Sequence, residues 1–429
     1  MKLWDKGFSI DKKIDIFTVG NDRMLDTVLA RYDIAGNKAQ AAMLCSIGVL
    51  SEKELEDVNR ELDDILAIVD AGEFEIEDSF EDVHSKIEFM LTERLGDTGK
   101  KIHTARSRND QVLVDMHLYT RDEILNIREG VLRLFNLLME LSEKYKDVLL
   151  PGYTHLQVAM PSSFGLWFGA YGESLIDDVY MLNAAYKIAD QNPLGSAAGY
   201  GSSFPIDREK TTQEMHFSQM KVNSVAAQMS RGKLEKTTAM AMASVAGTLS
   251  KMSMDICLYM CQNFAFVSFP DELTTGSSIM PHKKNPDVFE LIRSKCNKIQ
   301  TLPMELIMIQ NNLPSGYQRD LQLLKESFVP AISTLKSCLD MAVFMLKNIK
   351  VSQNLLEDPR YLYIFSVEEV NKMVINGVPF RDAYKKVGRD IMEGNFNPEK
   401  TVYHTHIGSL GNLRNDLIRE KMEKAIKDQ

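Results

Sequence analysis

The sequence has little that would mark an exported, membrane-bound or metal-stapled protein. Five cysteines in 429 residues are few and odd in number, which favours a reducing, cytoplasmic location over a disulfide framework. Cys257 and Cys261 lie four residues apart, but no second pair stands at zinc-ligand spacing, so we interpret them as buried thiols. The first residues lack an apolar leader, and we find no run of about 18 apolar residues. We therefore expect no signal peptide, no membrane span and no bound metal.

The chain also lacks an excess of positive charge. Its 50 lysines and arginines stand against 60 aspartates and glutamates, a formal net charge of -10. Nucleic acids and membrane surfaces are held mainly by basic protein surface, so a general binder of either is excluded. A local basic cluster in a cleft would instead attract an acidic small molecule.

Several common catalytic motifs are missing. Neither Ser277 nor Ser278 has glycines two residues before and after it, as a hydrolase nucleophile elbow requires. The zinc motif His-Glu-x-x-His is absent, and His404-Thr-His406 has no evident partners. Residues 192–201 are rich in glycine but have neither the dinucleotide spacing nor a Gly-Lys-Ser/Thr phosphate loop. We interpret that stretch as a bend or a place of tight packing.

Signals for β-strands are scarce, whereas helical periodicity is widespread. Apolar residues recur every three to four positions across 124–141, 234–260 and 328–349, which indicates long helices with a buried face. Ser51 followed by Glu54 forms a capping box and predicts a helix start. The sequence therefore predicts a mostly α architecture with an elongated bundle at its centre.

The pattern changes along the chain in a way that predicts three domains. We place an amino-terminal helical domain at 1–103, a central bundle at 104–350, and a small carboxy-terminal helical domain at 351–429, where prolines and glycines shorten the segments. One further helix is expected across 290–309. The acidic stretch 73–82 has no periodicity and is interpreted as a solvated connection.

The densest polar stretch is residues 274–287, Thr-Thr-Gly-Ser-Ser-Ile-Met-Pro-His-Lys-Lys-Asn-Pro-Asp. Its glycine and prolines interrupt the backbone between helical segments, while Lys283 and Asn285 offer a cation and an amide. Such a loop would suit a carboxylate-bearing substrate. A solvated surface turn is the alternative.

Three other polar segments accompany it. Residues 101–111 contain two arginines whose guanidinium groups match carboxylates, although a plain helix amino terminus would also explain the stretch. Residues 151–157 are expected to form a short turn that carries His155, either a structural histidine or an acid-base group. Residues 316–326 could line a site or begin an amphipathic helix.

Taken together, these motifs resemble one protein family. Gly276-Ser-Ser-Ile-Met-Pro-His-Lys-Lys-Asn-Pro286 is similar to the signature loop of the fumarase/aspartase superfamily, whose members remove a group β to a carboxylate and release fumarate. Within that superfamily, 283–293, 104–112 and 151–157 resemble argininosuccinate lyases, whereas fumarases usually show Gly-Lys-Val-Asn at 282–285. The resemblance covers nearly the whole chain.

The resemblance carries expectations about fold, assembly and reaction. It implies a three-domain fold around a central bundle of long helices, and a homotetramer whose sites each draw on three chains. It implies cleavage of argininosuccinate to arginine and fumarate in arginine biosynthesis, with no metal or organic cofactor.

The resemblance also assigns catalytic roles. Ser277 would be the base that removes the proton next to the substrate carboxylate, and Lys283 and Asn285 would stabilise the resulting aci-carboxylate. His155, oriented by Glu290 and with Thr154 beside it, would support proton delivery to the departing guanidinium nitrogen.

The remaining matched residues would bind substrate. They are Thr18, Ser107, Arg108, Asn109, Tyr317, Gln322 and Lys325. Arg108 and its two neighbours would hold carboxylates, and the last three residues would contact the arginine-like or succinyl portions. Thr18 occupies the place of an amino-terminal serine.

Two positions depart from the family pattern, and two other functions stay open at this point. Ala105 stands where glycine is common, and Asn37 stands where serine is common. The first alternative is another fumarate-releasing enzyme, such as adenylosuccinate lyase, which the basic stretches at 106–110 and 283–284 argue against. The second is a crystallin-like structural protein, which would need none of the assigned catalytic residues.

Overall fold

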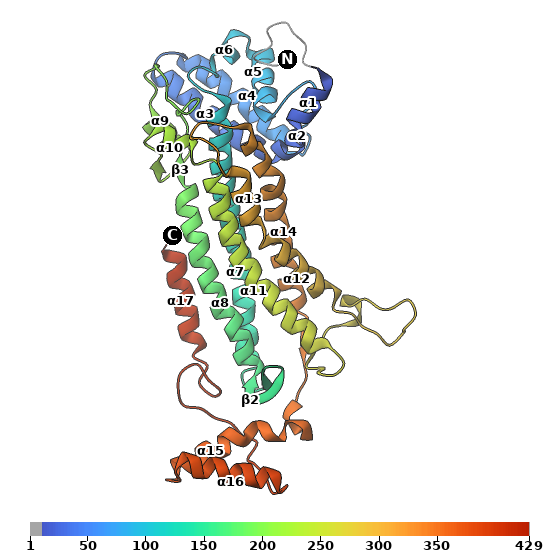
Figure 1. The fold of residues 1–429 in the computed structure, drawn as a ribbon. Coiled ribbons are helices and arrows are strands. Elements are labelled where there is room, and N and C mark those ends of the chain that lie inside the picture. Colours follow the sequence, from blue (N-terminus) through green and yellow to red (C-terminus); the bar gives the residue numbers. More distant parts are fainter. Residues whose placement is uncertain (1–10, 429) are drawn as a thin grey trace.

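The computed structural model describes residues 11–428 and is mostly helical (Figure 1). Its centre is an elongated bundle of helices that run up and down between two ends of the molecule. The bundle helices are α7 (Arg108–Lys144), α8 (Phe164–Ala189), α11 (Lys233–Met260), α12 (Asp287–Ile299), α13 (Leu302–Gln310) and α14 (Leu324–Leu346). The predicted mostly α architecture with a central bundle is confirmed.

The periodic apolar residues of the sequence fill the bundle core. Ile127, Val131 and Leu138 on α7 are fully buried, as are Val245 and Leu249 on α11. Because such residues recur every three to four positions, each helix turns a continuous apolar face to its neighbours. Their burial ties α7, α8, α11 and α14 into one hydrophobic core.

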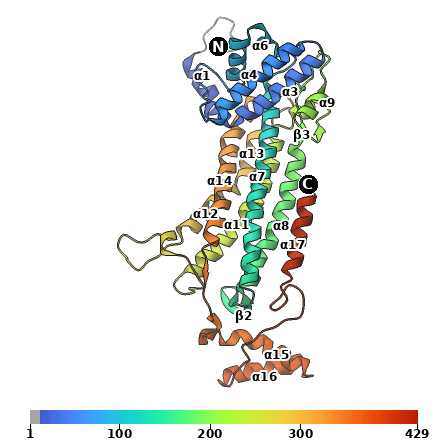
Figure 2. The ribbon, with the colours of Figure 1, turned by 180° about the vertical axis from the view of Figure 1, so that it is seen from behind.

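A cap of shorter helices closes one end of the bundle (Figures 1 and 2). These are α1 (Lys12–Val19), α2 (Asp22–Asp26), α3 (Ala30–Ser46), α4 (Glu52–Asp70), α5 (Val83–Leu95) and α6 (Asp97–Lys101), with the 3-10 turn Thr27–Leu29. The predicted capping box is present at the start of α4, where Ser51 accepts from the Glu54 amide and Glu54 accepts from the Ser51 amide.

The segment between α8 and α11 adds further short elements at the same end. They are β3 (Gln191–Asn192), α9 (Arg208–Glu214), β4 (Gln219–Met220) and α10 (Ser224–Gln228). The glycine-rich stretch packs tightly here, since a Cβ at Gly199 would lie 3.2 Å from the Gln228 side chain. The expectation of close packing at these glycines is met.

One local prediction missed an interruption and another was wrong. Residues 290–309 are helical as predicted, but they form two helices, α12 and α13, because the chain turns at Gln300 and Thr301 before Pro303 opens α13. Residues 151–157 form an antiparallel hairpin of β1 (Leu149–Thr154) and β2 (Gln157–Ser163), where a simple turn was expected. Another short pair joins β5 (Val267–Ser268) to β6 (Lys350–Val351), and 3-10 turns lie at Asp271–Leu273 and Arg319–Leu323.

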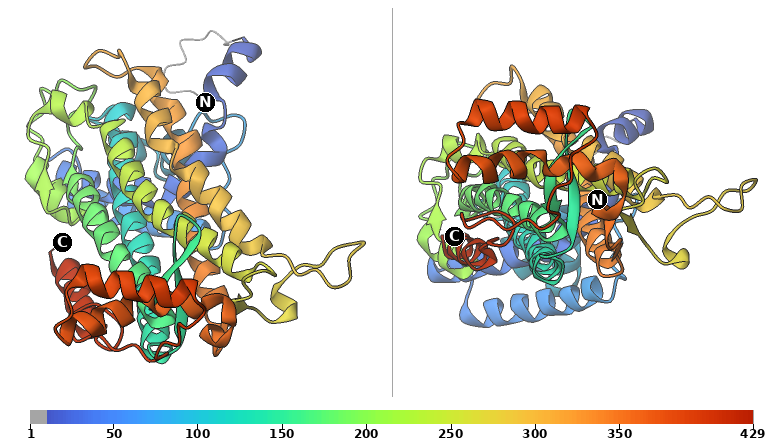
Figure 3. Two further views of the ribbon diagram at one scale, coloured as in Figure 1. Left: turned by 60° about the horizontal axis from the view of Figure 1, so that its bottom comes forward. Right: turned by 90° about the horizontal axis from the view of Figure 1, so that it is seen from below.

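The carboxy-terminal region divides between two places (Figure 3). After the 3-10 turns Leu355–Glu357 and Pro359–Phe365, α15 (Ser366–Ile375) and α16 (Phe380–Met392) pack around a small core of their own. Helix α17 (Asn415–Lys427) instead returns along α8, where the buried Asn183 amide donates to the Ala425 carbonyl at 2.7 Å. From the sequence, α17 was placed in the same domain as α15 and α16. In the structure, α17 packs along α8 of the bundle.

One segment has the length and composition of a membrane-crossing helix, Arg319–Leu346. In the structure its apolar residues Phe328, Ile332 and Leu335 are fully buried against other bundle helices. Its Lys325 lies in a buried ion-pair cluster. The apolar composition of this segment is therefore explained by its place in the bundle core.

Candidate active site

A cavity of about 240 Å³ lies where the capping helices meet the starts of α7 and α14. It brings together Arg108, Asn109, Tyr317, Gln322 and Lys325, five of the predicted substrate-binding residues. Thr18 does not line the cavity itself, but its peptide oxygen accepts from the Gln322 side-chain amide at 2.9 Å. The polar segments 101–111 and 316–326, which lie about 200 residues apart in sequence, thus line the same cavity. We call this cavity the α7 pocket.

Arg108 occupies the first turn of α7, positioned by its neighbours. Ser107 caps the helix and forms a capping box with Asp110, so the helix-start interpretation of this stretch also holds. The Arg108 guanidinium donates to the Asp82 carboxylate at 2.7 Å and to the Ser85 hydroxyl at 2.7 Å. Burial by itself would raise the pKa of Asp82, but His84 and Arg108 outweigh it and lower this pKa to about 2. Arg108 is therefore held by an ionised partner.

Lys325 is buried on the opposite wall and is also paired. Its ammonium group lies 2.9 Å from the Asp22 carboxylate and contacts Asp26 as well. Burial raises the pKa of Asp22 to about 6, against the opposing effect of Lys325. Arg231 lines the pocket too and forms a buried ion pair with Glu235 at 2.8 Å.

The pocket therefore sets charges of both signs against each other. Its acidic lining residues are Asp22, Asp26, Glu81 and Asp82, and its basic ones are Arg108, Arg231, Arg319 and Lys325. Such a lining suits a ligand that carries carboxylates together with a cationic group.

Residues 274–286 form a long loop that projects from the side of the bundle (Figures 1 and 3). Its base is closed by a bridge between Thr275 and Asn285, and the Asn285 side chain donates to the Gly276 carbonyl at 3.3 Å. The Ser277 hydroxyl oxygen accepts from the amides of Ile279 and Met280 at 3.3 and 3.2 Å. Two N–H dipoles therefore point at the proposed base, which favours its anionic form.

Thr154 and His155 lie at the tip of the β1–β2 hairpin. His155 and Leu156 are the two central residues of its turn, with φ of 54° and 57°. Such a turn is normally made by glycine or asparagine, so two larger residues here carry backbone strain of the kind that gathers at functional sites. His155 is exposed, and within the described residues it makes no hydrogen bond or ion pair with Glu290, which is exposed on the first turn of α12.

The start of α7, which lines the pocket, and the hairpin lie at opposite ends of the bundle (Figure 2). Arg108 begins α7, and the hairpin follows its far end, 37 helical residues later. A helix rises 1.5 Å per residue, so α7 is about 55 Å long and separates the pocket from the hairpin. Arg108 and His155 of one chain cannot contact the same small molecule.

Comparison with known proteins agrees with these motifs. The sequence matches the Lyase family over residues 9–301. It is 60% identical to argininosuccinate lyase from Phocaeicola vulgatus over 99% of this chain and 95% of that protein. Argininosuccinate lyase from Thermotoga neapolitana is 38% identical over 90% of this chain and 97% of that protein. The chain belongs to the argininosuccinate lyase family.

Solved structures extend the family assignment to the fold. The crystal structure of EDDS lyase in complex with formate has a TM-score of 0.79 at 18% identity, covering 98% of this chain and 90% of that one. Class II fumarase from Schistosoma mansoni has a TM-score of 0.74 at 16% identity, covering 96% and 94%. At these identities the likeness confirms the fumarase/aspartase-like fold and no more.

The two departures from the argininosuccinate lyase pattern have clear structural settings. Ala105 has φ of 65°, a left-handed conformation that glycine adopts without cost, which explains why glycine is common there. Asn37 donates to the Asp33 carboxylate at 2.9 Å and accepts from Arg106 at 2.8 Å. Asn37 thus links two charged residues behind the pocket.

Several residues that line the α7 pocket were not predicted from the sequence. Asp26 and Arg231 were not considered, and Asp82 was placed in a solvated connection, although it is half-buried at the start of α5 and binds Arg108. His84 also lines the pocket. The sequence carried one local signal for Asp82. Aspartate is a preferred helix-capping residue, and Asp82 accepts from the amide of Ser85, three residues later at the start of α5.

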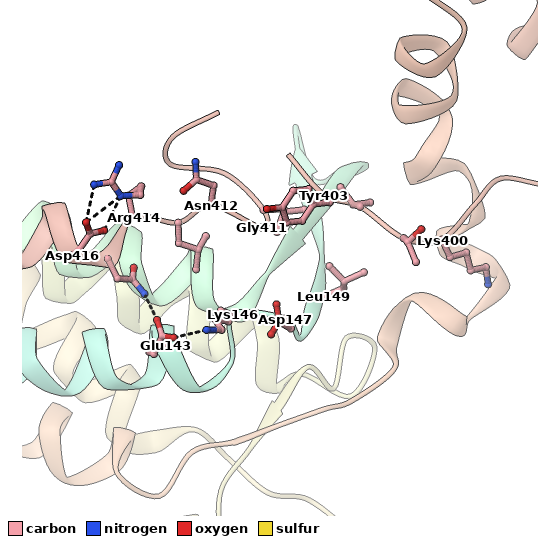
Figure 4. Close-up of a pocket in the computed structure, with 15 residues that line it drawn as sticks. Glu143, Lys146, Asp147, Leu149, Lys400, Tyr403, Gly411, Asn412, Arg414 and Asp416 are labelled. Atoms are coloured by element: carbon pink, nitrogen blue, oxygen red, sulfur yellow. Dashed lines mark hydrogen bonds and ion pairs between the residues drawn. The ribbon is translucent and has the colours of Figure 1, made fainter. Parts of the chain in front are cut away.

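A larger cavity of about 610 Å³ lies at the other end of the bundle, between the end of α7 and residues 400–416 (Figure 4). Its charged side chains are largely satisfied by one another, as in the ion pairs Lys146–Glu143 and Arg414–Asp416. It contains none of the residues that the argininosuccinate lyase motifs assign. The α7 pocket is therefore the better candidate for substrate binding.

Proposed function

We propose that the chain cleaves argininosuccinate to arginine and fumarate by β-elimination, as a step of arginine biosynthesis and without a metal or organic cofactor. The observation that carries the proposal is the α7 pocket, in which the family's substrate-binding residues converge and acidic and basic side chains face one another. Argininosuccinate carries three carboxylates and a guanidinium group, which matches this lining.

Ser277 removes a proton from the carbon next to a substrate carboxylate, and the C–N bond that then breaks is on the adjacent carbon. A free hydroxyl is a poor base, so its alkoxide needs stabilisation, and the amides of Ile279 and Met280 already point at its oxygen. Lys283 and Asn285 lie on the same loop and stabilise the doubly negative aci-carboxylate that forms. Closure of the loop over bound substrate excludes water and strengthens these interactions.

The departing guanidinium nitrogen receives its proton with the help of His155. The strained hairpin tip presents this side chain to solvent, free to enter a site on a neighbouring chain. Thr154 lies beside it, and Glu290 orients the imidazole. Arg108 and Asn109 bind substrate carboxylates beside Ser107, while Tyr317, Gln322 and Lys325 contact the rest of the molecule near Thr18.

Each complete site is assembled from several copies of the chain, in a homotetramer. The separation of about 55 Å along α7 supports this, because one chain holds Arg108 and His155 too far apart for one substrate. The bundle also exposes large apolar side chains to solvent, as interfaces do. They include Met254, Leu291, Met304, Met308, Met341 and Phe344. The five free cysteines fit a cytoplasmic location.

A direct assay tests the reaction. Purified protein with argininosuccinate should release fumarate, followed at 240 nm, and an equal amount of arginine. Turnover of adenylosuccinate in place of argininosuccinate would assign the chain to the rival lyase. Folded, oligomeric protein that turns over neither compound would favour the structural role and contradict the proposal.

A further inference from the structure

His84 is a buried histidine that the assigned mechanism does not use. It lies in the first turn of α5, is 3% exposed and lines the α7 pocket. Its Nδ1 atom lies 2.8 Å from the Asp33 carboxylate of α3 and 3.6 Å from the Asp115 carboxylate of α7. The side chain therefore joins three helices directly behind the pocket.

The charges around His84 decide its protonation state. Burial alone would lower its pKa, but Asp33, Asp115 and Asp82 outweigh burial and raise the pKa to about 9. Asp26 also acts on this cluster, and Arg106 and Arg108 are the nearby cations. Both oxygens of Asp115 are buried without a hydrogen-bond partner, so the imidazolium is their nearest compensating charge.

The same imidazolium acts on the residue that holds Arg108. His84 lies two residues after Asp82, and its charge helps keep that half-buried carboxylate ionised. Asp82 in turn receives hydrogen bonds from the Ser85 amide at 2.8 Å and from Arg108. Loss of the positive charge would leave three carboxylates around an uncharged ring and loosen the start of α5.

We propose that His84, held between Asp33 and Asp115, is a positioning residue that fixes Asp82 and, through it, the Arg108 guanidinium for a substrate carboxylate. The proposal rests on the proposed function, because it deepens the assignment of Arg108 as a carboxylate binder. His84 itself acts through Asp82 and does not touch the reacting atoms.

A bound cation is the competing account of this cluster. Asp33, His84 and Asp115 bring one ligand-type atom each within 4.8 Å of one another. A divalent ion would need the neutral imidazole, whereas the protonated ring already balances the carboxylates without an ion. Metal analysis of the purified protein before and after a chelator separates the two.

The kinetic test compares His84→Gln with His117→Gln. His117 is a matched control, because it is also fully buried but lies between α7 and the end of α8, bonded to the Ala189 carbonyl at 2.8 Å. In His84→Gln we expect KM for argininosuccinate to rise on the order of 10- to 100-fold, as on loss of an orienting partner, with a smaller change in kcat. His117→Gln should lose stability and keep the wild-type KM.

The pH dependence gives a second readout. Because the pKa of His84 is raised in the folded state, the stability it contributes is complete below its ordinary value of 6.5 and is lost as pH rises towards 9. The wild type should therefore lose stability and show rising KM over that range, and His84→Gln should lack both changes.

Each possible outcome either supports or overturns the proposed role of His84. A wild-type KM and pH profile in folded His84→Gln, or an equal KM increase in His117→Gln, would overturn the proposal. So would a divalent metal bound at about one per chain and lost in Asp115→Asn. If His84→Gln does not fold, Asp33→Asn replaces it and should show the same KM increase. If the wild type does not cleave argininosuccinate, the proposed function fails, and weaker fumarate binding by His84→Gln in calorimetry still tests the role of His84.

Discussion

At the scale of single residues, the proposed base Ser277 is positioned by hydrogen bonds within its own loop. The two amides that point at its oxygen come from residues two and three positions further along the chain. The geometry therefore depends on the local turn and is present before any substrate arrives. The neighbouring Ser278 is exposed and offers a control within the same turn.

We expect Ser277→Ala to lower kcat by about 10²-fold or more, because general-base catalysis contributes about 10²–10⁴-fold. Thermal unfolding should be unchanged, since the Ser277 side chain contacts only its own exposed loop. Ser278→Ala should keep most of the activity. Fumarate release at 240 nm measures both variants, and near wild-type turnover by Ser277→Ala would remove it as the base.

Ala105 offers a prediction about stability. A non-glycine residue with φ of 65° carries about 1–2 kcal/mol of strain, part of which Ala105→Gly should release. Ala67→Gly, at an exposed position inside α4, should instead cost about 0.5–1 kcal/mol. Denaturant unfolding of the two variants should give opposite signs, and equal destabilisation would show that Ala105 is unstrained.

Residues with local roles could be predicted from the sequence, and residues with long-range roles could not. Ser51 and Ser107 cap helices through contacts three positions away, which the sequence displays. Asp82 and Lys325 depend on partners 26 and 299 positions away, and no spacing rule predicts such pairs. The family resemblance named Lys325 but left its ion-pair partners, the half-buried Asp22 and the buried Asp26, unidentified.

At the scale of elements, the junction between α7 and α8 determines where the hairpin points. Gly165 in the first turn of α8 packs against the end of α7, where an added Cβ would lie 2.5 Å from the Lys146 Cα and 2.6 Å from the Ser142 carbonyl oxygen. The Ser142 hydroxyl also donates to the Gly165 carbonyl at 2.7 Å. These contacts fix the two helix ends from which β1 and β2 extend.

Gly165→Ala should therefore destabilise the fold by about 1–3 kcal/mol, since the added methyl group meets backbone atoms that cannot move aside. Gly388→Ala is the matched control, because a Cβ there meets nothing within 4 Å. That change should stabilise α16 by about 0.4–1 kcal/mol. Calorimetric unfolding measures both, and an undiminished Tm in Gly165→Ala would contradict the tight junction.

Long elements were predictable, and short or interrupted ones were not. The periodic stripes gave α7, α11 and α14 because many apolar positions agree along each helix. The hairpin of β1 and β2 was missed because its turn is made by His155 and Leu156. The sequence at these two positions has no glycine or asparagine to indicate a tight turn. The packing of α17 along α8 was not predicted, since an amphipathic pattern shows that a face is buried, but not against which partner.

At the scale of the whole molecule, one chain does not bring the proposed site residues together. The α7 pocket holds the proposed substrate-binding residues, while His155 lies on the hairpin beyond the far end of α7, a helix about 55 Å long, and Ser277 lies on a loop that projects from the bundle. The proposed chemistry requires all three regions at one substrate. The assembly is therefore part of the catalyst in this account, and its exposed apolar bundle faces supply the contacts.

Complementation between two inactive variants tests this claim most directly. Arg108→Ala and His155→Ala each remove one region, so each homo-oligomer should be nearly inactive with argininosuccinate. In oligomers formed by co-expression, some sites take the Arg108 region from one variant and the His155 region from the other, and these sites are native. We predict that the mixed oligomer regains a substantial fraction of wild-type fumarate release. Mixed oligomers that form and stay inactive, or a monomer with full activity, would contradict the account.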